Sequence, residues 1–336
     1  MIEDTMRTSF VACTAILCAL LSCCQLFAQL KTYGDENVSR KVDAEILIRL
    51  KENTIQPAEP ASAAEFVRRV HLDLLGRIPT SEETRNYLQD SSKDKHHRLV
   101  NRLLDHPEMS LFWADMLNLW LNGRDEEPGP GYREFREYLS NGLEENKKWD
   151  RFAREMLLPG GDAKAQPAAY FLGRRLKLPR EEQLDGMTVA VGSSFFGVRV
   201  ECAKCHDHPY VAEWKQDHYY GLASFLNRTQ LVNKGNKLPL KERTNGEVSF
   251  NTTDRVEKKA KVMFLDNKVF ADKDNNRRKL LADYALVPEN PYFKRAMANR
   301  IWKQLMGRGL VNPVDQIHSS NPIRIKLSLN RFLPVA

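Results

Sequence analysis

Cysteine is scarce in this chain of 336 residues, and it is unevenly placed. Four of the six cysteines lie close to the N-terminus: Cys13, Cys18, Cys23 and Cys24. Beyond them only Cys202 and Cys205 occur. An exported fold stapled by disulfides uses more cysteines than this single pair. We therefore expect Cys202 and Cys205 to form part of a site.

Other features that the sequence lacks argue against several classes of protein. After the N-terminal region, no segment approaches the roughly eighteen consecutive apolar residues that a membrane-spanning helix needs. The net charge is +7, but no run of five or more basic residues occurs, which argues against nucleic-acid binding. Phosphate-binding loops, Gly-x-Ser-x-Gly elbows and His-Glu-x-x-His helices are also missing. No catalytic set of residues is identified, so the sequence does not decide whether the protein is an enzyme.

The N-terminal region has the pattern of an export signal. Arg7 precedes a short apolar stretch, Phe10 to Leu21, and Leu26-Phe27-Ala28 follows before polar sequence begins. This pattern predicts a signal peptide over residues 1–28 and an exported protein in the periplasm or cell envelope. Lipid attachment at Cys23 is an alternative, and an uncleaved membrane anchor is another. Contact with a membrane is expected only through this region.

The strongest motif is Cys202-Ala203-Lys204-Cys205-His206, followed by Asp207-His208-Pro209. Two thiols at this spacing, with a histidine directly after the second, are the signature of covalent c-type haem attachment. In that interpretation Cys202 and Cys205 form thioethers and His206 is the proximal iron ligand. His218 or Met263 would be the distal ligand, although Met263 lies in an apolar run typical of a buried strand.

Two other interpretations of the motif stay open. Cys202, Cys205 and His208, with His206 or His218 as the fourth ligand, could form a closed structural zinc site. A redox-active disulfide is the third, but that chemistry belongs at the start of a helix in a βαβ unit, and the flanks here are helical. Export favours haem, because c-type attachment takes place outside the cytoplasm.

The apolar spacing predicts a mainly α fold, a helical bundle with a small β insertion near residues 245–270. Ser62 is expected to cap a helix that buries Phe66, Val70, Leu74 and Leu75, and Thr80 or Ser81 to begin the next one. The segment 107–121 is apolar nearly all round, so we expect a helix buried between others. Further helices are predicted over residues 41–50, 96–104, 132–143, 149–158, 180–196, 216–226, 277–286 and 291–306.

Several longer motifs point to a family. They include Leu72-Asp73-Leu74-Leu75-Gly76-Arg77-Ile78-Pro79-Thr80, the stretch Phe196 to Pro209, and Tyr219-Tyr220-Gly221-Leu222-Ala223-Ser224-Phe225. With them the chain resembles the exported planctomycete DUF1549 domain, also described as cytochrome-like. Asn290-Pro291-Tyr292-Phe293 and Asn299-Arg300-Ile301-Trp302 resemble the opening of the DUF1553 domain, which usually follows.

The resemblance implies a domain organisation. A DUF1549-like helical domain is expected over residues 40–231, a connecting segment with short strands over 232–287, and a truncated start of a DUF1553-like helical domain over 288–336. After His318-Ser319-Ser320-Asn321-Pro322 the last fourteen residues depart from the family pattern.

Together these features predict an exported protein that carries haem c and has an electron-transfer or redox role. Its partners are expected to be other exported or envelope proteins, and not nucleic acid. The alternative is a zinc-stabilised helical module that binds an exported protein or a polysaccharide.

Overall fold

The computed structural model describes residues 36–124, 129–159, 166–231, 240–271 and 276–322. The chain divides into two units, residues 1–43 and 44–336, and the boundary falls inside the first described helix. All contacts described below lie within the second unit. The expected signal peptide, Cys23 and the divergent tail after Pro322 lie outside the described residues.

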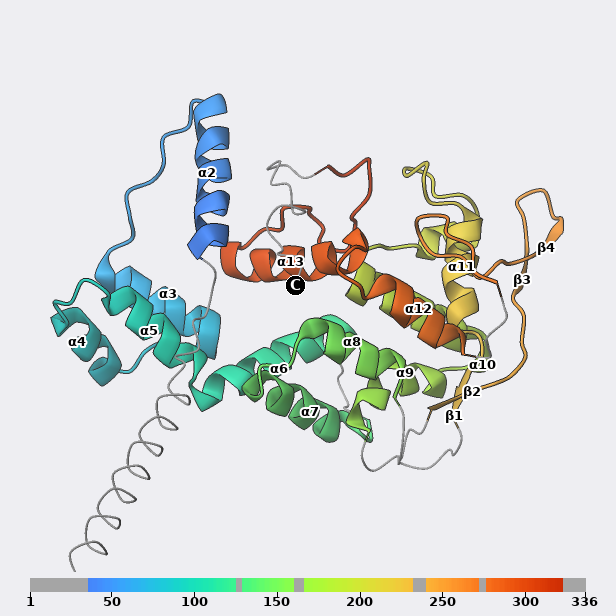
Figure 1. Cartoon of the computed structure of the whole chain (residues 1–336), viewed down its shortest axis with the longest axis horizontal. Helices are drawn as coiled ribbons and strands as arrows, with labels where there is room; N and C mark the ends of the chain where they lie inside the picture. The colour runs from blue at the N-terminus through green and yellow to red at the C-terminus, as the bar shows by residue number, and fades with distance from the viewer. Residues whose placement is uncertain (1–35, 125–128, 160–165, 232–239, 272–275, 323–336) are drawn as a thin grey trace, which may run out of the picture. The chain divides into compact units, whose positions relative to one another are not determined.

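Helices dominate the described residues, which confirms the predicted mainly α fold (Figure 1). In chain order they are α2 (Glu36–Glu52), α3 (Ala63–Leu75), α4 (Ser81–Gln89), α5 (Lys95–Leu104), α6 (Pro107–Asn122), α7 (Tyr132–Glu144), α8 (Trp149–Leu157), α9 (Tyr170–Gly173), α10 (Arg180–Val191), α11 (Gln216–Leu226), α12 (Arg277–Ala285) and α13 (Pro291–Met306). Within the described ranges, no helix is both long and apolar enough to cross a membrane.

The strands form two small antiparallel sheets. β3 (Ser249–Asn251) pairs with β4 (Glu257–Lys259), inside the predicted β insertion. Residues 261–270, however, contain only an isolated bridge between Met263 and Val269 instead of a strand. β1 (Thr229–Leu231) and β2 (Leu240–Glu242) form the other sheet, which lies outside the predicted β insertion near residues 245–270.

Helices α3, α4 and α5 pack together around a small apolar cluster of their own. The predicted cap of α3 is present, Ser62 with Glu65, and Thr80 forms a second capping box with Glu83 at the start of α4. The predicted buried face of α3 is partly wrong. Val67, His71 and Leu75 are the residues buried, because they follow one line along the helix at a spacing of four. Of the four residues predicted, only Leu75 is buried, while the others flank this line and are partly buried: Phe66, Val70 and Leu74.

Helix α6 packs against α7 and α3 and contributes to the main apolar core. Its buried apolar residues are Trp113, Ala114, Leu117 and Leu121. The helix therefore lies between other helices, as predicted, but it is not buried all round, since Leu111 and Leu119 are 43% and 36% exposed. These two leucines lie eight residues apart, so they share a face that no helix among the described residues covers.

Two buried arginines attach α12 to the rest of the core. The Nη1 of Arg277 donates to the carbonyl oxygen of Ser224 at 3.1 Å. Arg278 pairs with Glu242 of β2 at 3.2 Å and donates to the carbonyl oxygen of Leu157 at 2.8 Å. Both guanidinium groups are therefore satisfied by carboxylates and carbonyl oxygens, as buried charges require. These contacts join α12 to β2, α8 and α11.

Gly221 allows α11 to approach the Met263 segment closely. A Cβ atom at this position would lie 2.8 Å from the carbonyl oxygen of Met263. Exchange of a helical glycine for alanine ordinarily raises stability, but overpacking against rigid backbone lowers it. We therefore expect Gly221→Ala to lower the free energy of unfolding by about 1–3 kcal/mol in urea titrations. The control is Gly129→Ala, whose added Cβ meets nothing within 4 Å. Equal stability of the two variants would contradict this packing.

The ion pair between Arg77 and Glu83 makes the stability of the fold depend on pH in the acidic range. Arg77 donates to both carboxylate oxygens, at 2.9 and 3.0 Å, and these hydrogen bonds lower the pKa of Glu83 to about 2. A carboxylate with a lowered pKa stabilises the fold above its unfolded pKa, and this contribution is lost as the pH falls through the folded pKa. We expect the difference in unfolding free energy between the wild type and Glu83→Gln to be constant above pH 5 and to shrink toward pH 2. Glu82→Gln, in the same turn of α4, should show no such trend.

Candidate functional site

The Cys-x-x-Cys-His motif lies between α10 and α11, as the apolar spacing predicts. After α10 the chain passes through a π-helical turn, η4 (Gly192–Phe196), and then through a short 3-10 helix, η5 (Glu201–Lys204). η5 and α11 are in contact. The motif therefore begins in η5, and contacts with α11 fix the position of that turn.

Burial alternates sharply along the motif. Val200 and Ala203 are buried in the main core, with exposures of 1% and 0%. Cys202 and Cys205 are exposed and carry free thiols. Cys202 lies in η5, and Cys205 follows its last residue with a helical backbone conformation, so the two cysteines are separated by about one turn. The turn thus presents two thiols outward while its apolar side chains fix it to the core.

Gln216, in the first turn of α11, fixes the backbone of the motif. Its side chain is buried, and Nε2 lies 3.4 Å from the carbonyl oxygen of Lys204 and 3.2 Å from that of Cys205. The same amide reaches the carbonyl oxygen of Asn251 in β3 at 3.3 Å. Tyr220, one turn further along α11, donates its hydroxyl to the carbonyl oxygen of Lys204 at 2.9 Å. The end of η5 is therefore attached to both α11 and the small sheet.

His206 is exposed beside the thiols and has one ring nitrogen engaged. Its Nδ1 lies 2.7 Å from the carbonyl oxygen of Asp207. Because a carbonyl oxygen can only accept a hydrogen bond, Nδ1 carries the proton. The Nε2 atom of the neutral ring then keeps its lone pair, which is the arrangement found in metal-ligating histidines. The side chain of Asp207 accepts from the backbone N–H of Gln216 at 3.1 Å and so orders the same turn.

His208 points into a separate set of hydrogen bonds. The ring Nδ1 of His208 accepts from the backbone N–H of Tyr210 at 3.2 Å. The backbone N–H of His208 donates to the carbonyl oxygen of Trp214 at 2.8 Å. Burial lowers the pKa of His208, against an opposing effect of Glu201. Within the part of the chain that the structure describes, no group of three or more His, Cys, Asp or Glu side chains could hold a metal ion. The set proposed for zinc is therefore not gathered: Cys202, Cys205, His206 and His208.

The two residues considered as distal ligands are both engaged elsewhere. His218 is 5% exposed, its Nδ1 accepts from the backbone N–H of Lys215 at 3.1 Å, and the Asn267 side chain also hydrogen-bonds the ring. Met263 is 8% exposed and packs its backbone against Gly221 in the middle of α11. Both side chains are therefore buried, whereas Cys202 and Cys205 are exposed.

The C-terminal segment adds residues that sequence reasoning missed. The N–H of Ile317 donates to the carbonyl oxygen of Gly197 at 2.9 Å, and the N–H of Ser319 donates to the Glu213 carboxylate at 3.0 Å. These bonds place His318 near the motif. Burial and the nearby His208 lower the pKa of its ring, and the Glu213 carboxylate opposes them. The ring's Nδ1 atom is buried and has no hydrogen-bond partner in the described chain. No spacing rule connects it to cysteines more than a hundred positions earlier.

Replacement of Gln216 tests whether it holds the motif in place. In Gln216→Leu the carbonyl oxygens of Lys204 and Cys205 lose a buried donor, so the free energy of unfolding should fall by about 1–3 kcal/mol. In protein produced without haem, Cys205 should also be alkylated faster, as measured by peptide mass spectrometry. Gln89→Leu, an exposed position in α4, is the matched control. Unchanged alkylation and stability in Gln216→Leu would show that the motif is held by other contacts.

Comparison with known proteins identifies the family of this chain. The family PSCyt2, described as "Protein of unknown function (DUF1549)", matches residues 41–231, which is more than half of the chain. A second family, PSD1, described as "Protein of unknown function (DUF1553)", matches residues 277–327. No curated protein matches the chain, and no solved structure does. The motif, its supporting helix α11 and strand β1 all fall within the first match, and the chain belongs to the DUF1549 family.

Proposed function

We propose that this protein is an exported carrier of one covalently attached c-type haem with an electron-transfer or redox role. The observation that supports this most is the exposure of both free thiols, one turn apart, beside an exposed histidine whose Nδ1 is held by a backbone carbonyl group. Covalent attachment needs both thiols accessible, and iron ligation needs an unprotonated ring nitrogen. Cys202 and Cys205 would hold the haem and His206 would ligate its iron.

The chain's own groups set the properties of such a site. The Asp207 carbonyl oxygen fixes the tautomer and the orientation of His206. The exposure of Cys202 and Cys205 leaves the site open to a redox partner at the protein surface. When bound, the haem supplies one-electron chemistry, with a potential that depends on axial ligation and on exposure to solvent. The export expected from the N-terminal region suits this proposal, since c-type attachment is an extracytoplasmic process.

The zinc alternative has less support from the geometry. A closed zinc site needs four ligands in a tetrahedral arrangement. His208, which would be one of them, uses Nδ1 to accept from Tyr210, and its ring is ordered by the loop before α11.

The two proposals predict different outcomes in one set of variants. The full chain is expressed in a host that matures c-type cytochromes, and the reduced pyridine haemochrome spectrum and the zinc content are recorded. Haem that resists acid extraction is expected in the wild type, and it should be lost or attached through a single thioether in Cys202→Ser and Cys205→Ser. His206→Ala should retain the thioethers but shift the Soret band, because the iron loses its axial nitrogen.

His208→Ala is the matched control, since it changes a neighbouring histidine that is not a haem ligand in this proposal. It should keep the wild-type spectrum. A wild-type protein without haem but with stoichiometric zinc, lost in His208→Ala, would overturn the proposal in favour of the zinc-stabilised module.

A further inference from the structure

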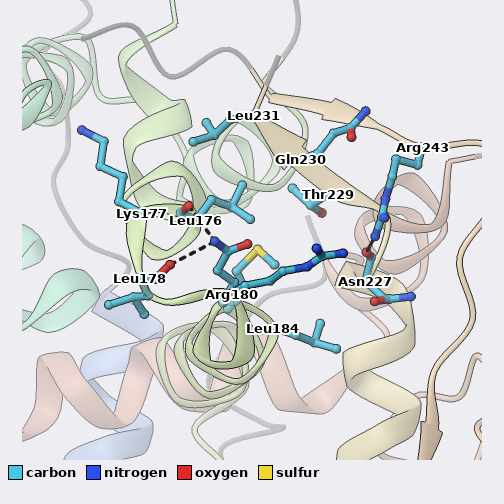
Figure 2. Close-up of a pocket in the computed structure, with 12 residues that line it drawn as sticks. Leu176, Lys177, Leu178, Arg180, Leu184, Asn227, Thr229, Gln230, Leu231 and Arg243 are labelled. Carbon is cyan, nitrogen blue, oxygen red and sulfur yellow. Dashed lines mark hydrogen bonds between the residues drawn. The ribbon is translucent and has the colours of Figure 1, made fainter. Parts of the chain in front are cut away.

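A second concave site lies at the opposite end of α11 from the motif. It has a volume of about 810 Å³ and is lined by η3 (Arg175–Lys177), the first half of α10 and strand β1. Figure 2 shows the side chains around it. Small-molecule sites in proteins have volumes of roughly 300–1,000 Å³. Asn227, which follows the last residue of α11, lines the pocket, whereas Gln216 at the first residue holds the motif. At 1.5 Å per residue, α11 separates these two points by roughly 16 Å.

All charged residues that line the pocket are basic. Lys177, Arg180 and Arg243 line the pocket, and none of the other lining residues is acidic. Arg180 has no hydrogen bond or ion pair with any residue in the described ranges, and Figure 2 shows its side chain reaching across the pocket toward Asn227 and Arg243. The Nη2 of Arg243 donates to the carbonyl oxygen of Asn227 at 2.7 Å, which orders this second guanidinium group. Cations gathered in a cleft without carboxylates favour an anionic ligand.

Uncharged polar groups lie beside the two guanidinium groups. Thr229 is 5% exposed, lines the pocket, and its Oγ1 has no hydrogen-bond partner in the described part of the chain. A buried hydroxyl without a partner is unfavourable, so this atom marks a place where a ligand group can bond. The Nε2 of Gln183 donates to the carbonyl oxygens of Leu176 and Leu178 at 3.1 and 3.0 Å. This fixes the Gln183 side chain and leaves its amide oxygen as an acceptor.

Apolar side chains form the rest of the wall, among them Leu176, Leu184 and Met187. The combination of apolar wall, orphaned hydroxyl, amides and cations is not that of a site for a bare inorganic anion. We infer that the pocket binds a hydroxylated organic anion of about disaccharide size, a sugar acid or a sugar sulfate. Its acidic group lies between Arg180 and Arg243, and one of its hydroxyl groups bonds Thr229.

The pocket and the motif share α10. Leu184 lines the pocket, and the next residue, Asp185, pairs with Lys204 of the motif at 3.4 Å and accepts from the Tyr219 hydroxyl. The pocket site does not depend on haem, because none of its lining residues belongs to the motif.

Isothermal titration of the full chain with lactobionate, an anionic disaccharide acid, tests the inference. Lactobionate should bind at least tenfold more tightly than lactose, the neutral disaccharide, and than inorganic sulfate. Arg180→Gln and Arg243→Gln should each weaken lactobionate binding about tenfold, which corresponds to 1.4 kcal/mol. Thr229→Val should weaken both the acid and the neutral sugar by a similar factor.

The matched control for charge is Arg133→Gln, an 81% exposed arginine on α7 that should leave binding unchanged. Cys202→Ser should also bind lactobionate as the wild type does. The inference is overturned if lactobionate binds no more tightly than lactose, if sulfate binds equally well, or if Arg180→Gln and Arg243→Gln bind like the wild type. Circular dichroism melting curves confirm that the variants remain folded, which is expected because both arginines are exposed.

Discussion

The hydrogen bonds from the buried amide of Gln216 to the carbonyl oxygens of Lys204 and Cys205 are the interaction on which the site depends. A four-residue 3-10 turn has poor hydrogen-bond geometry and little stability alone. Here the turn is held from both sides, by Ala203 in the core and by Gln216 at the start of α11. The thiols and His206 can then remain exposed without making the backbone that carries them mobile.

Local signals were sufficient to predict most helices. Capping residues and apolar spacing determine where α3, α4 and α13 begin, and a glycine at positive φ, Gly307, follows the last residue of α13. What the sequence could not show is which face of a helix is covered. Leu111 and Leu119 of α6 are exposed because no element among the described residues covers that side, and this depends on packing between elements far apart in the chain.

The same division holds for the candidate site. Cys202, Cys205 and His206 are recognisable because their chemistry depends on a spacing of a few residues. Three other features could not be recognised from the sequence, because each depends on segments that are distant in the chain. They are the contacts of Gln216, the Ile317–Ser319 segment and the pocket beside Thr229. The distal-ligand hypothesis for His218 also relied on proximity along the chain, and in the structure that ring already bonds Lys215 and Asn267. His318, which approaches from the DUF1553 match, lies nearer to the motif's histidine His208 than its position in the sequence indicates.

The central claim is that Cys202 and Cys205 carry haem covalently. Peptide mass spectrometry of the wild-type protein, purified from a host that matures c-type cytochromes, tests it most directly. The account predicts that the peptide containing both cysteines has the added mass of one haem. Recovery of that peptide with two unmodified thiols, from a host in which a known c-type cytochrome is fully matured, would contradict it.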